Sequence, residues 1–176
     1  MSADRIARLV DRQDILDCLT RFSRGIDRFD RDVFLSAFHA DATIATGSFV
    51  GGPESLYDWA TTIHAGQPAT QHSLLNHACE LDGDSAHTET YYLFAATNPD
   101  ATNMLAGGRY IDRFERRDGE WRITLRCNTI EWSSVVPAAA LPFADVPDIA
   151  VNGMPTRDRD DISYRRPLTN LRAEQR

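Results

Sequence analysis

The chain has 176 residues, of which 42% are hydrophobic and 26% charged, and this length and composition predict one globular domain with an apolar core. The formal net charge of -7 disfavours nucleic acid and anionic membranes as partners, because binding to either depends on clustered Lys and Arg. No apolar run reaches the ~20 residues that cross a bilayer, and the N-terminus does not lead into a secretory signal, so we expect a cytoplasmic protein.

The first 64 residues contain the helical part of the pattern. Apolar side chains recur at spacings of four, three and four over 15–26, which predicts an amphipathic helix. A second, short helix is expected over 30–38, and a short strand over 42–46. The glycines at 51–52 predict a turn, and the proline that follows suits the first position of a third helix, over 53–63.

After residue 68 the period of the pattern changes to two, which predicts long strands in sequence-adjacent pairs up to residue 133. The clearest hairpin joins 110–114 to 121–125 through a turn at 116–119, whose Asp-Gly dipeptide can supply positive φ. A similar turn is expected at 82–84. Helices followed by such strands predict an α+β fold, with the helices on one face of a curved antiparallel sheet that closes around an apolar pocket.

The last part of the chain is rich in proline. Five of the eight prolines lie in the last 44 residues, so regular elements there must be short. We therefore expect a domain over 1–133 and an extended, proline-rich tail over 134–176, which packs on the body of the protein or on a neighbouring subunit.

His72 is the first candidate for chemistry. In a strand over 71–81, strict alternation places His72 on one face and His77 on the other, so the two could not share a pocket. A His at the start of a strand, beside small and apolar groups, can accept a proton near neutral pH. The alternative is a structural His that is bonded to backbone or solvent.

Asp27 is the second candidate, and it follows the apolar stripe of the first helix directly. A carboxylate at the C-terminal end of a helix lies on the unfavourable side of the helix dipole, so another interaction should account for it. Two alternatives stay open. Either Asp27 caps the next helix, which Asp30 could do equally well, or it accepts a hydrogen bond from a cation such as a catalytic His.

Arg126 is the third candidate, in a strand whose residues alternate between two faces. If Trp121 and Ile123 fill the core, the other set lines the opposite side. That other set contains Arg126, Asn128 and Trp132. A buried Arg needs a partner anion, so Arg126 is either paired with Asp112 or Glu131, or directed at an oxygen or halide of a substrate.

Several motifs of cofactor and metal chemistry are missing from the sequence. It has no Gly-rich phosphate loop, no GxSxG elbow, no HExxH and no CxxC pair. His72 and His77, on opposite faces of one strand, would make a poor metal clamp. We therefore expect no metal and no cofactor, which leaves acid/base chemistry by side chains.

Several segments of the sequence form a familiar set. They are Gly25-Ile26-Asp27, 34–43 (FLSAFHADAT), 51–54 (GGPE), 71–76 (QHSLLN), 108–123 with its RRDGEW turn, and 164–168 (YRRPL) in the tail. Together they resemble the SnoaL-like branch of the nuclear transport factor 2-like superfamily over about residues 5–133. The resemblance implies a cone-shaped α+β fold, built from a curved sheet and N-terminal helices, and a homo-oligomer, either a dimer or a trimer.

Within this branch the pattern is similar to that of scytalone dehydratase and hexachlorocyclohexane dehydrochlorinase, which use a His-Asp dyad for elimination from a ring substrate. The resemblance implies that His72 and Asp27 form the dyad and that Arg126 matches the pocket Arg of the dehydrochlorinase. The Lys that the dehydrochlorinase carries five residues before its Asp is Phe22 here, which disfavours dehydrohalogenation. The residues expected to line the substrate pocket are Phe22, Tyr92, Tyr110, Arg126, Asn128 and Trp132.

The resemblance supports two kinds of function. The first is a cofactor-independent lyase of the dehydratase type, or an isomerase, that acts on a small hydrophobic ring compound. The second is a non-catalytic subunit that binds a small ligand or assembles a complex, as the β-subunit of ring-hydroxylating dioxygenases does. The presence of both Asp27 and His72 favours the enzyme, because a structural subunit has no need for the pair.

Overall fold

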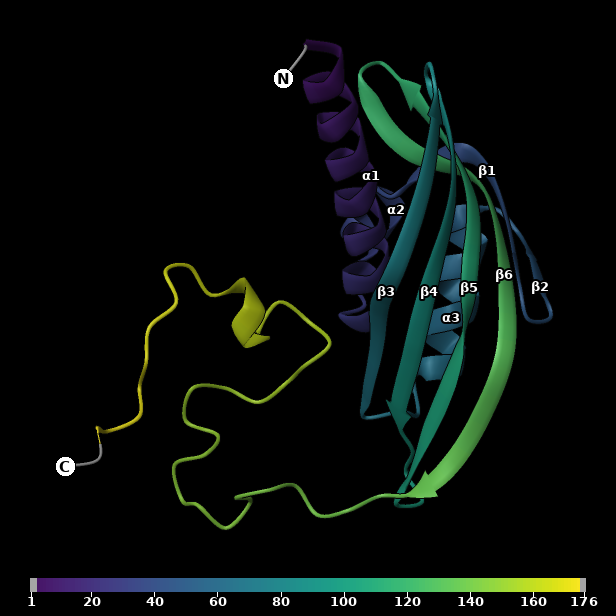
Figure 1. The fold of residues 1–176 in the computed structure, drawn as a ribbon. Coiled ribbons are helices and arrows are strands. Elements are labelled where there is room, and N and C mark those ends of the chain that lie inside the picture. The colour runs from purple at the N-terminus through teal and green to yellow at the C-terminus, as the bar shows by residue number, and fades with distance from the viewer. Residues whose placement is uncertain (1–2, 175–176) are drawn as a thin grey trace.

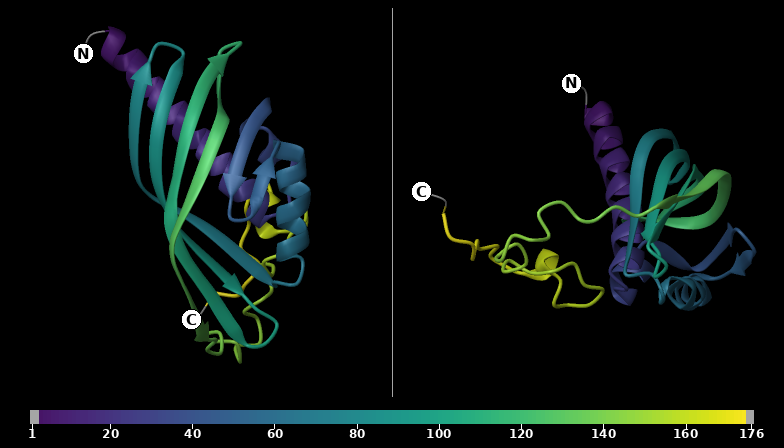
Figure 2. Two further views of the ribbon diagram at one scale, coloured as in Figure 1. Left: turned by 90° about the vertical axis from the view of Figure 1, so that its right-hand side faces the viewer. Right: turned by 90° about the horizontal axis from the view of Figure 1, so that it is seen from below.

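The computed structural model describes residues 3–174 and contains one six-stranded sheet with three α-helices against one of its faces (Figure 1). The helices are α1 (Ala3–Asp27), α2 (Arg31–Leu35) and α3 (Pro53–His64). The strands are β1 (Phe38–Thr46), β2 (Phe49–Gly51), β3 (Ala69–Asp82), β4 (Ser85–Thr97), β5 (Thr102–Arg117) and β6 (Glu120–Pro137). Two further views show the curvature of the sheet, with α3 beside β1 and β2 (Figure 2). None of the helices within 3–174 is both long and apolar enough to cross a membrane.

The sheet has the strand order β2-β1-β6-β5-β4-β3, so β2 and β3 form its two edges and the sheet does not close. Neighbouring strands are antiparallel except β1 and β6, which run parallel, with Ile44 opposite Arg126. The α+β class and the curved sheet against the N-terminal helices are confirmed, whereas the sheet stays open and contains one parallel pair where antiparallel strands were expected. A parallel pair joins segments far apart in the chain, so no local turn signals it.

Tight turns join the long strands. The β5–β6 turn is Asp118-Gly119, where both residues have positive φ, 54° and 85°, as a two-residue hairpin of type I′ requires. The hairpin between β3 and β4 reverses at 83–84, so both predicted hairpins are confirmed. Gly51 is the last residue of β2 and pairs with Ile44, and Gly52 then precedes α3, so the chain passes from strand to helix at the predicted position. The hairpin between β1 and β2 reverses earlier, at Gly47, which has a φ of 55°.

The C-terminal end of α1 packs closely on α2 because Gly25 has no side chain. A Cβ atom at this position would lie 2.4 Å from the backbone nitrogen of Phe34. The chain then turns at Phe29, which has a φ of 51°, and Asp30 caps α2 by accepting a hydrogen bond from the backbone N–H of Val33 at 3.3 Å. The predicted apolar stripe of α1 is buried and comprises Ile15, Leu19, Phe22 and Ile26.

A β-bulge interrupts the alternation of side chains in β3. Leu74 pairs with Tyr92 but His77 pairs with Thr90, so one extra residue lies between them on β3. His72 and His77 therefore lie on the same face of the sheet, and the prediction of opposite faces is wrong. The Nδ1 atom of His77 lies 2.9 Å from the Oγ1 atom of Thr90, its pairing partner on β4.

A second bulge lies in β6, at Thr124. Ile123 pairs with Phe114, whereas Leu125 pairs with the preceding residue of β5, so Thr124 is the extra residue. Ile123 and Arg126 therefore lie on the same face, and their predicted separation onto opposite faces is wrong.

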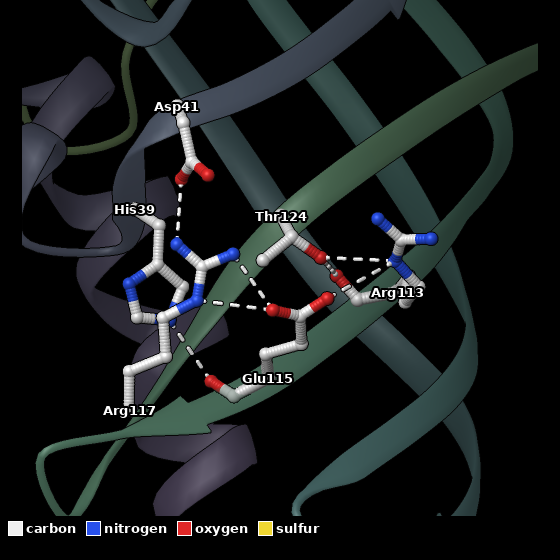
Figure 3. A network of polar contacts seen from close by, with 6 residues as sticks. All are labelled: His39, Asp41, Arg113, Glu115, Arg117 and Thr124. Atoms are coloured by element: carbon white, nitrogen blue, oxygen red, sulfur yellow. Dashed lines mark hydrogen bonds and ion pairs between the residues drawn. The ribbon is translucent and has the colours of Figure 1, made fainter.

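Polar contacts surround this bulge (Figure 3). The Oγ1 atom of Thr124 donates to the backbone oxygen of Arg113 at 3.1 Å and accepts from the Nε atom of Arg113 at 3.2 Å. Nearby, the Nη1 atom of Arg117 lies 2.8 Å from Oδ1 of Asp41. These contacts join β1, β5 and β6 where the parallel pair begins.

The strand β6 continues to Pro137, past the expected boundary at 133, and residues 138–174 then form an extended tail with one short 3₁₀-helix, Ile162–Tyr164. The tail returns to the end of α1 (Figure 1). The Tyr164 hydroxyl donates to Asp30 at 2.6 Å, and Arg157 donates to the backbone oxygen of His64 at 2.7 Å. The tail therefore packs on the loop after α1 and on the end of α3 of its own chain.

Candidate active site

A cavity of about 360 Å³ lies between the inner face of the sheet and the helices. Its lining is mostly aromatic and aliphatic with a few polar groups, which is the usual character of a site for a small molecule. Besides His72, the cavity is lined by these residues of the predicted pocket: Phe22, Tyr92, Tyr110, Arg126 and Asn128.

His72 and Asp27 meet at the wall of this cavity. The Nδ1 atom of His72 lies 2.7 Å from Oδ1 of Asp27, and each side chain is 12% exposed. The other carboxylate oxygen accepts the backbone N–H of His72 at 2.8 Å, and the Thr70 hydroxyl donates to Oδ1 at 3.0 Å. Because an ionised carboxylate only accepts hydrogen bonds, Nδ1 of His72 carries the proton. In neutral His72 the Nε2 atom therefore bears the lone pair.

Two roles were open for Asp27, namely the cap of the next helix and the contact with a His, and the structure assigns the first to Asp30 and the second to Asp27. Asp30 caps α2, so Asp27 is free to bind β3 from the end of α1. The link between the first helix and β3 places a carboxylate beside a His that is distant from it along the chain.

Aromatic rings surround the imidazole of His72. Its centroid lies 4.7 Å from that of Phe94 and 6.1 Å from that of Phe22. Rings at these distances exclude water, and the interaction between the imidazole and the carboxylate is stronger in such apolar surroundings than in water.

Arg126 forms a buried ion pair with Asp112 across β5 and β6. Its Nε and Nη2 atoms donate to the two carboxylate oxygens at 2.7 Å each, and its side chain is 1% exposed. The guanidinium lies against the rings of Phe22 and Tyr110, 4.1 Å from each centroid. Asp112 is thus the partner anion, while Glu131 forms a separate ion pair nearer the surface. The Nη1 atom of Arg126 has no hydrogen-bond partner within residues 3–174.

Two tyrosines and an asparagine supply further polar atoms. Tyr92 and Tyr110 are stacked, with their centroids 4.4 Å apart. Burial raises the pKa of both phenols, so both keep their protons at neutral pH. The Nδ2 atom of Asn128 donates to the Thr46 hydroxyl at 2.8 Å, and its Oδ1 atom has no partner in the described part of the chain.

Trp132 does not line the cavity, contrary to the prediction. Gly108 pairs with Ile130 but Gly107 pairs with Trp132, so a further bulge in β6 changes the face of the strand. The indole lies over Gly107, where a Cβ atom would come within 2.5 Å of the ring, and the Trp132 side chain is 49% exposed. Ile130 and Ser133 line the cavity in its place.

His64, in the last turn of α3, is a cavity residue that the sequence analysis missed. Its ring centroid lies 6.2 Å from that of His72 and 5.4 Å from that of Phe94. Its Nδ1 atom lies 2.7 Å from the Oε1 atom of Gln67. Burial lowers the pKa of His64, so the imidazole is neutral at pH 7.

A signal for His64 is present in the sequence. The buried residues Leu56 and Ala60 and the cavity residue His64 are spaced by four and share one face of α3. The apolar stripe of this helix was instead expected to end at Ile63, whose side chain is 51% exposed. A shift of one residue at the end of a helix moves the side chain by about 100° around the axis, which decides between solvent and cavity.

These groups can move a proton and hold a polar atom of a ligand. They comprise an imidazole backed by a carboxylate, a second and neutral imidazole, phenol donors, and a guanidinium with one donor nitrogen, Nη1, that is unpartnered in the described part of the chain. Among residues 3–174, no group of three or more His, Cys, Asp or Glu side chains is placed to bind a metal ion.

Comparison with known proteins relates this fold to one family. The model of the SnoaL-like domain matches residues 7–127, and no curated protein matches the chain in sequence. Hexachlorocyclohexane dehydrochlorinase LinA type 2 has a similar solved structure, with 21% identity, a TM-score of 0.71, and a match over 78% of this chain and 98% of that one. LinA type 3 from Novosphingobium barchaimii has 20% identity and a TM-score of 0.71, and the match covers 78% of this chain and 99% of that one. A scytalone dehydratase-like protein from Novosphingobium aromaticivorans has 17% identity and a TM-score of 0.66, and the match covers 77% of this chain and 95% of that one.

At these identities the solved structures show a shared fold. The family model rests on sequence and covers well over half of the chain, and it agrees with the resemblance of residues 5–133. The protein therefore belongs to the SnoaL-like domain family.

Proposed function

We propose that the protein is a cofactor-independent lyase of the dehydratase type, which acts on a small and largely apolar ring compound bound in the cavity. His72 is the general base, and Asp27 positions it. The observation that carries the proposal is the contact of 2.7 Å between His72 and Asp27 at the wall of an apolar cavity. The family match and the structural neighbours support the proposal at the level of the fold, which is of the type that small-molecule lyases and isomerases use.

The proton moves in two steps. The Nε2 atom of His72 takes a proton from a ring carbon, and the electron pair of that C–H bond forms the new double bond while the hydroxyl leaves the neighbouring carbon with the C–O pair. Asp27 stabilises the imidazolium, which then protonates the leaving hydroxide to give water and neutral His72. General base catalysis of this kind contributes about 100- to 10,000-fold in rate.

The leaving group in this proposal is a hydroxyl rather than a chloride. Phe22 stands where the resemblance to hexachlorocyclohexane dehydrochlorinase places a Lys, so that position supplies no positive charge. Arg126 uses two of its donor atoms on Asp112, which neutralises much of its charge. A hydroxyl can take its proton from His72 and needs no additional cation.

A bicyclic β-hydroxyketone, 3-hydroxy-1-tetralone, tests the proposal, because its dehydration gives 1-naphthol, which is followed by absorbance. We expect turnover by the parent protein and a loss of about 100- to 10,000-fold in kcat in His72→Gln. His77→Gln is the matched control, since His77 lies on the same strand and face but does not line the cavity. Equal turnover in His72→Gln and the parent would contradict the proposal.

A ligand carrier or assembly subunit is the second candidate. The aromatic side chains of Tyr91 and Trp132 are exposed on the outer face of the sheet, where they suit contact with another subunit. A protein that binds cyclic alcohols and ketones in the cavity and turns over none of them would support this candidate. The homo-oligomer, dimer or trimer, stays a prediction that sedimentation analysis can check.

A further inference from the structure

A chain of hydrogen bonds fixes which nitrogen of His64 carries a proton. At its far end the Asp100 carboxylate, which can only accept, takes the hydroxyl proton of Thr102 at 2.6 Å. The Thr102 oxygen in turn accepts from the Nδ2 atom of Asn98 at 3.0 Å. The Asn98 oxygen accepts from the Nε2 atom of Gln67 at 3.1 Å. The Gln67 oxygen is therefore the group that faces the Nδ1 atom of His64, and Nδ1 must donate to it.

The opposite nitrogen of this ring is an unused acceptor. Since Nδ1 of His64 carries the proton, the Nε2 atom of the neutral ring bears a lone pair, and it has no hydrogen-bond partner in the described part of the chain. The ring keeps its place without a ligand, because Gln67 holds its Nδ1 atom and Arg157 holds its backbone oxygen. A ligand hydroxyl that donates to this nitrogen therefore makes a hydrogen bond that an apolar ligand of the same size cannot make, and it gains affinity.

The two imidazoles of the cavity have different partners behind them. His72 is backed by the Asp27 carboxylate, which stabilises a positive charge on the ring. His64 is backed by the neutral amide of Gln67, and burial lowers its pKa, against opposing effects of the hydrogen bond to Gln67 and of the Asp27 carboxylate. His72 is thus suited to take a proton from carbon, and His64 to accept a hydrogen bond while it stays neutral.

We propose that His64 is a specificity-determining residue of the cavity, whose Nε2 atom accepts a hydrogen bond from a hydroxyl group of the substrate. The substrate class is therefore hydroxylated ring compounds, and ring compounds that lack a donor bind more weakly. This inference rests on the proposed function only in that the substrate occupies this cavity. Both imidazoles line the same cavity, and their centroids are 6.2 Å apart, so one ring-sized ligand in the cavity can contact both.

Three naphthalenes of similar size test the donor requirement at equilibrium. 2-Naphthol carries a donor, whereas 2-fluoronaphthalene and 2-methoxynaphthalene do not. We expect the parent protein to bind 2-naphthol about tenfold more tightly than either of the others, measured by calorimetric titration. In His64→Phe, which keeps an aromatic ring but removes the acceptor, the preference should fall below about twofold.

Asn128 supplies the matched control, because its Oδ1 atom is another acceptor at the cavity without a partner. The preference should persist in Asn128→Leu and in His72→Phe. If it persists in His64→Phe and is lost in either of these two variants, the assignment to His64 is overturned. Absence of any preference in the parent protein overturns it as well.

A second measurement needs no variant to fold. In the ¹⁵N-labelled parent protein, the Nε2 resonance of His64 should lie in the range of a non-protonated nitrogen and should move upfield when 2-naphthol is added, but not when 2-fluoronaphthalene is added. An Nε2 resonance in the protonated range at pH 7 contradicts the inference.

Failure of the His64 assignment can be distinguished from failure of the proposed lyase function. Preference for 2-naphthol in a protein that never converts 3-hydroxy-1-tetralone supports the assignment of His64 and contradicts the lyase. Turnover of the tetralone in a protein without the preference supports the lyase and contradicts the assignment of His64.

Discussion

Asp27 binds His72 at two points, through the imidazole at 2.7 Å and through the backbone N–H at 2.8 Å. The two contacts use different oxygens of one carboxylate, so they fix the ring relative to its own strand. The direction of the free Nε2 atom is set before any ligand binds, and such preorganisation is what a general base requires.

Replacing Asp27 with Asn should remove activity while the fold is kept. An amide can still contact both nitrogens of His72, but it cannot stabilise an imidazolium and can favour the wrong tautomer. We expect kcat for 3-hydroxy-1-tetralone to fall by about 1,000- to 10,000-fold. Thr70→Val, which removes only the third hydrogen bond to the carboxylate, should cost far less activity. Equal losses in the two variants would contradict a specific role for the carboxylate charge.

The buried pair of Arg126 and Asp112 should be essential for stability. Asp112→Asn leaves a guanidinium that is 1% exposed without a counter-charge, so the free energy of unfolding should fall by about 3–5 kcal/mol in urea. Glu131→Gln is the matched control, because Glu131 pairs with Arg109 across the same two strands but near the surface. That variant should change stability little. A similar stability for both variants would show that burial of the pair has no such consequence.

The close approach of α1 and α2 predicts that Gly25 tolerates no side chain. Gly25→Ala places a Cβ atom 2.4 Å from the backbone of Phe34, which cannot move away as a flexible side chain could. We expect a loss of about 1–3 kcal/mol in unfolding free energy. Gly66→Ala, at a position with no atom within 4 Å, should be neutral. A neutral Gly25→Ala would mean that the two helices are farther apart than this structure has them.

Acidification should destabilise the protein through its neutral histidines. Burial lowers the pKa of His64 and His77 from the ordinary value of 6.5, so below pH 6.5 the unfolded chain binds protons that the folded chain does not. The free energy of unfolding should therefore decline as the pH falls from 6.5 to 5, and less steeply in His64→Gln. An identical slope in both proteins would show that His64 does not stay neutral on folding.

Much of the fold follows from local sequence signals. The apolar stripe of α1, the proline that begins α3, and the Asp118-Gly119 turn each act within a few residues and were predicted correctly. The parallel pair of β1 and β6 has no such signal, because it depends on contacts between distant segments. The contact between His72 and Asp27 was expected from family resemblance. Each residue taken alone fits a structural role equally well, because a single His can bond to the backbone and a single Asp can cap a helix.

The errors in the site have one physical cause. A bulge adds one residue to a strand and moves every later side chain to the other face, so strict alternation separated His72 from His77 and placed Trp132 in the cavity. The bulges become visible only once the partner strands are known. His64 was missed for a related reason, since the end of a helical stripe was placed one residue too early.

The fate of the carbon-bound proton tests the central claim most directly. With 3-hydroxy-1-tetralone deuterated at the carbon between the ketone and the hydroxyl-bearing carbon, dehydration by the parent protein should show a primary kinetic isotope effect. In His72→Gln, loss of the label should fall to the rate in buffer although 2-naphthol still binds. If His72→Gln removes the label as fast as the parent protein does, another group takes the proton and the account of His72 is wrong.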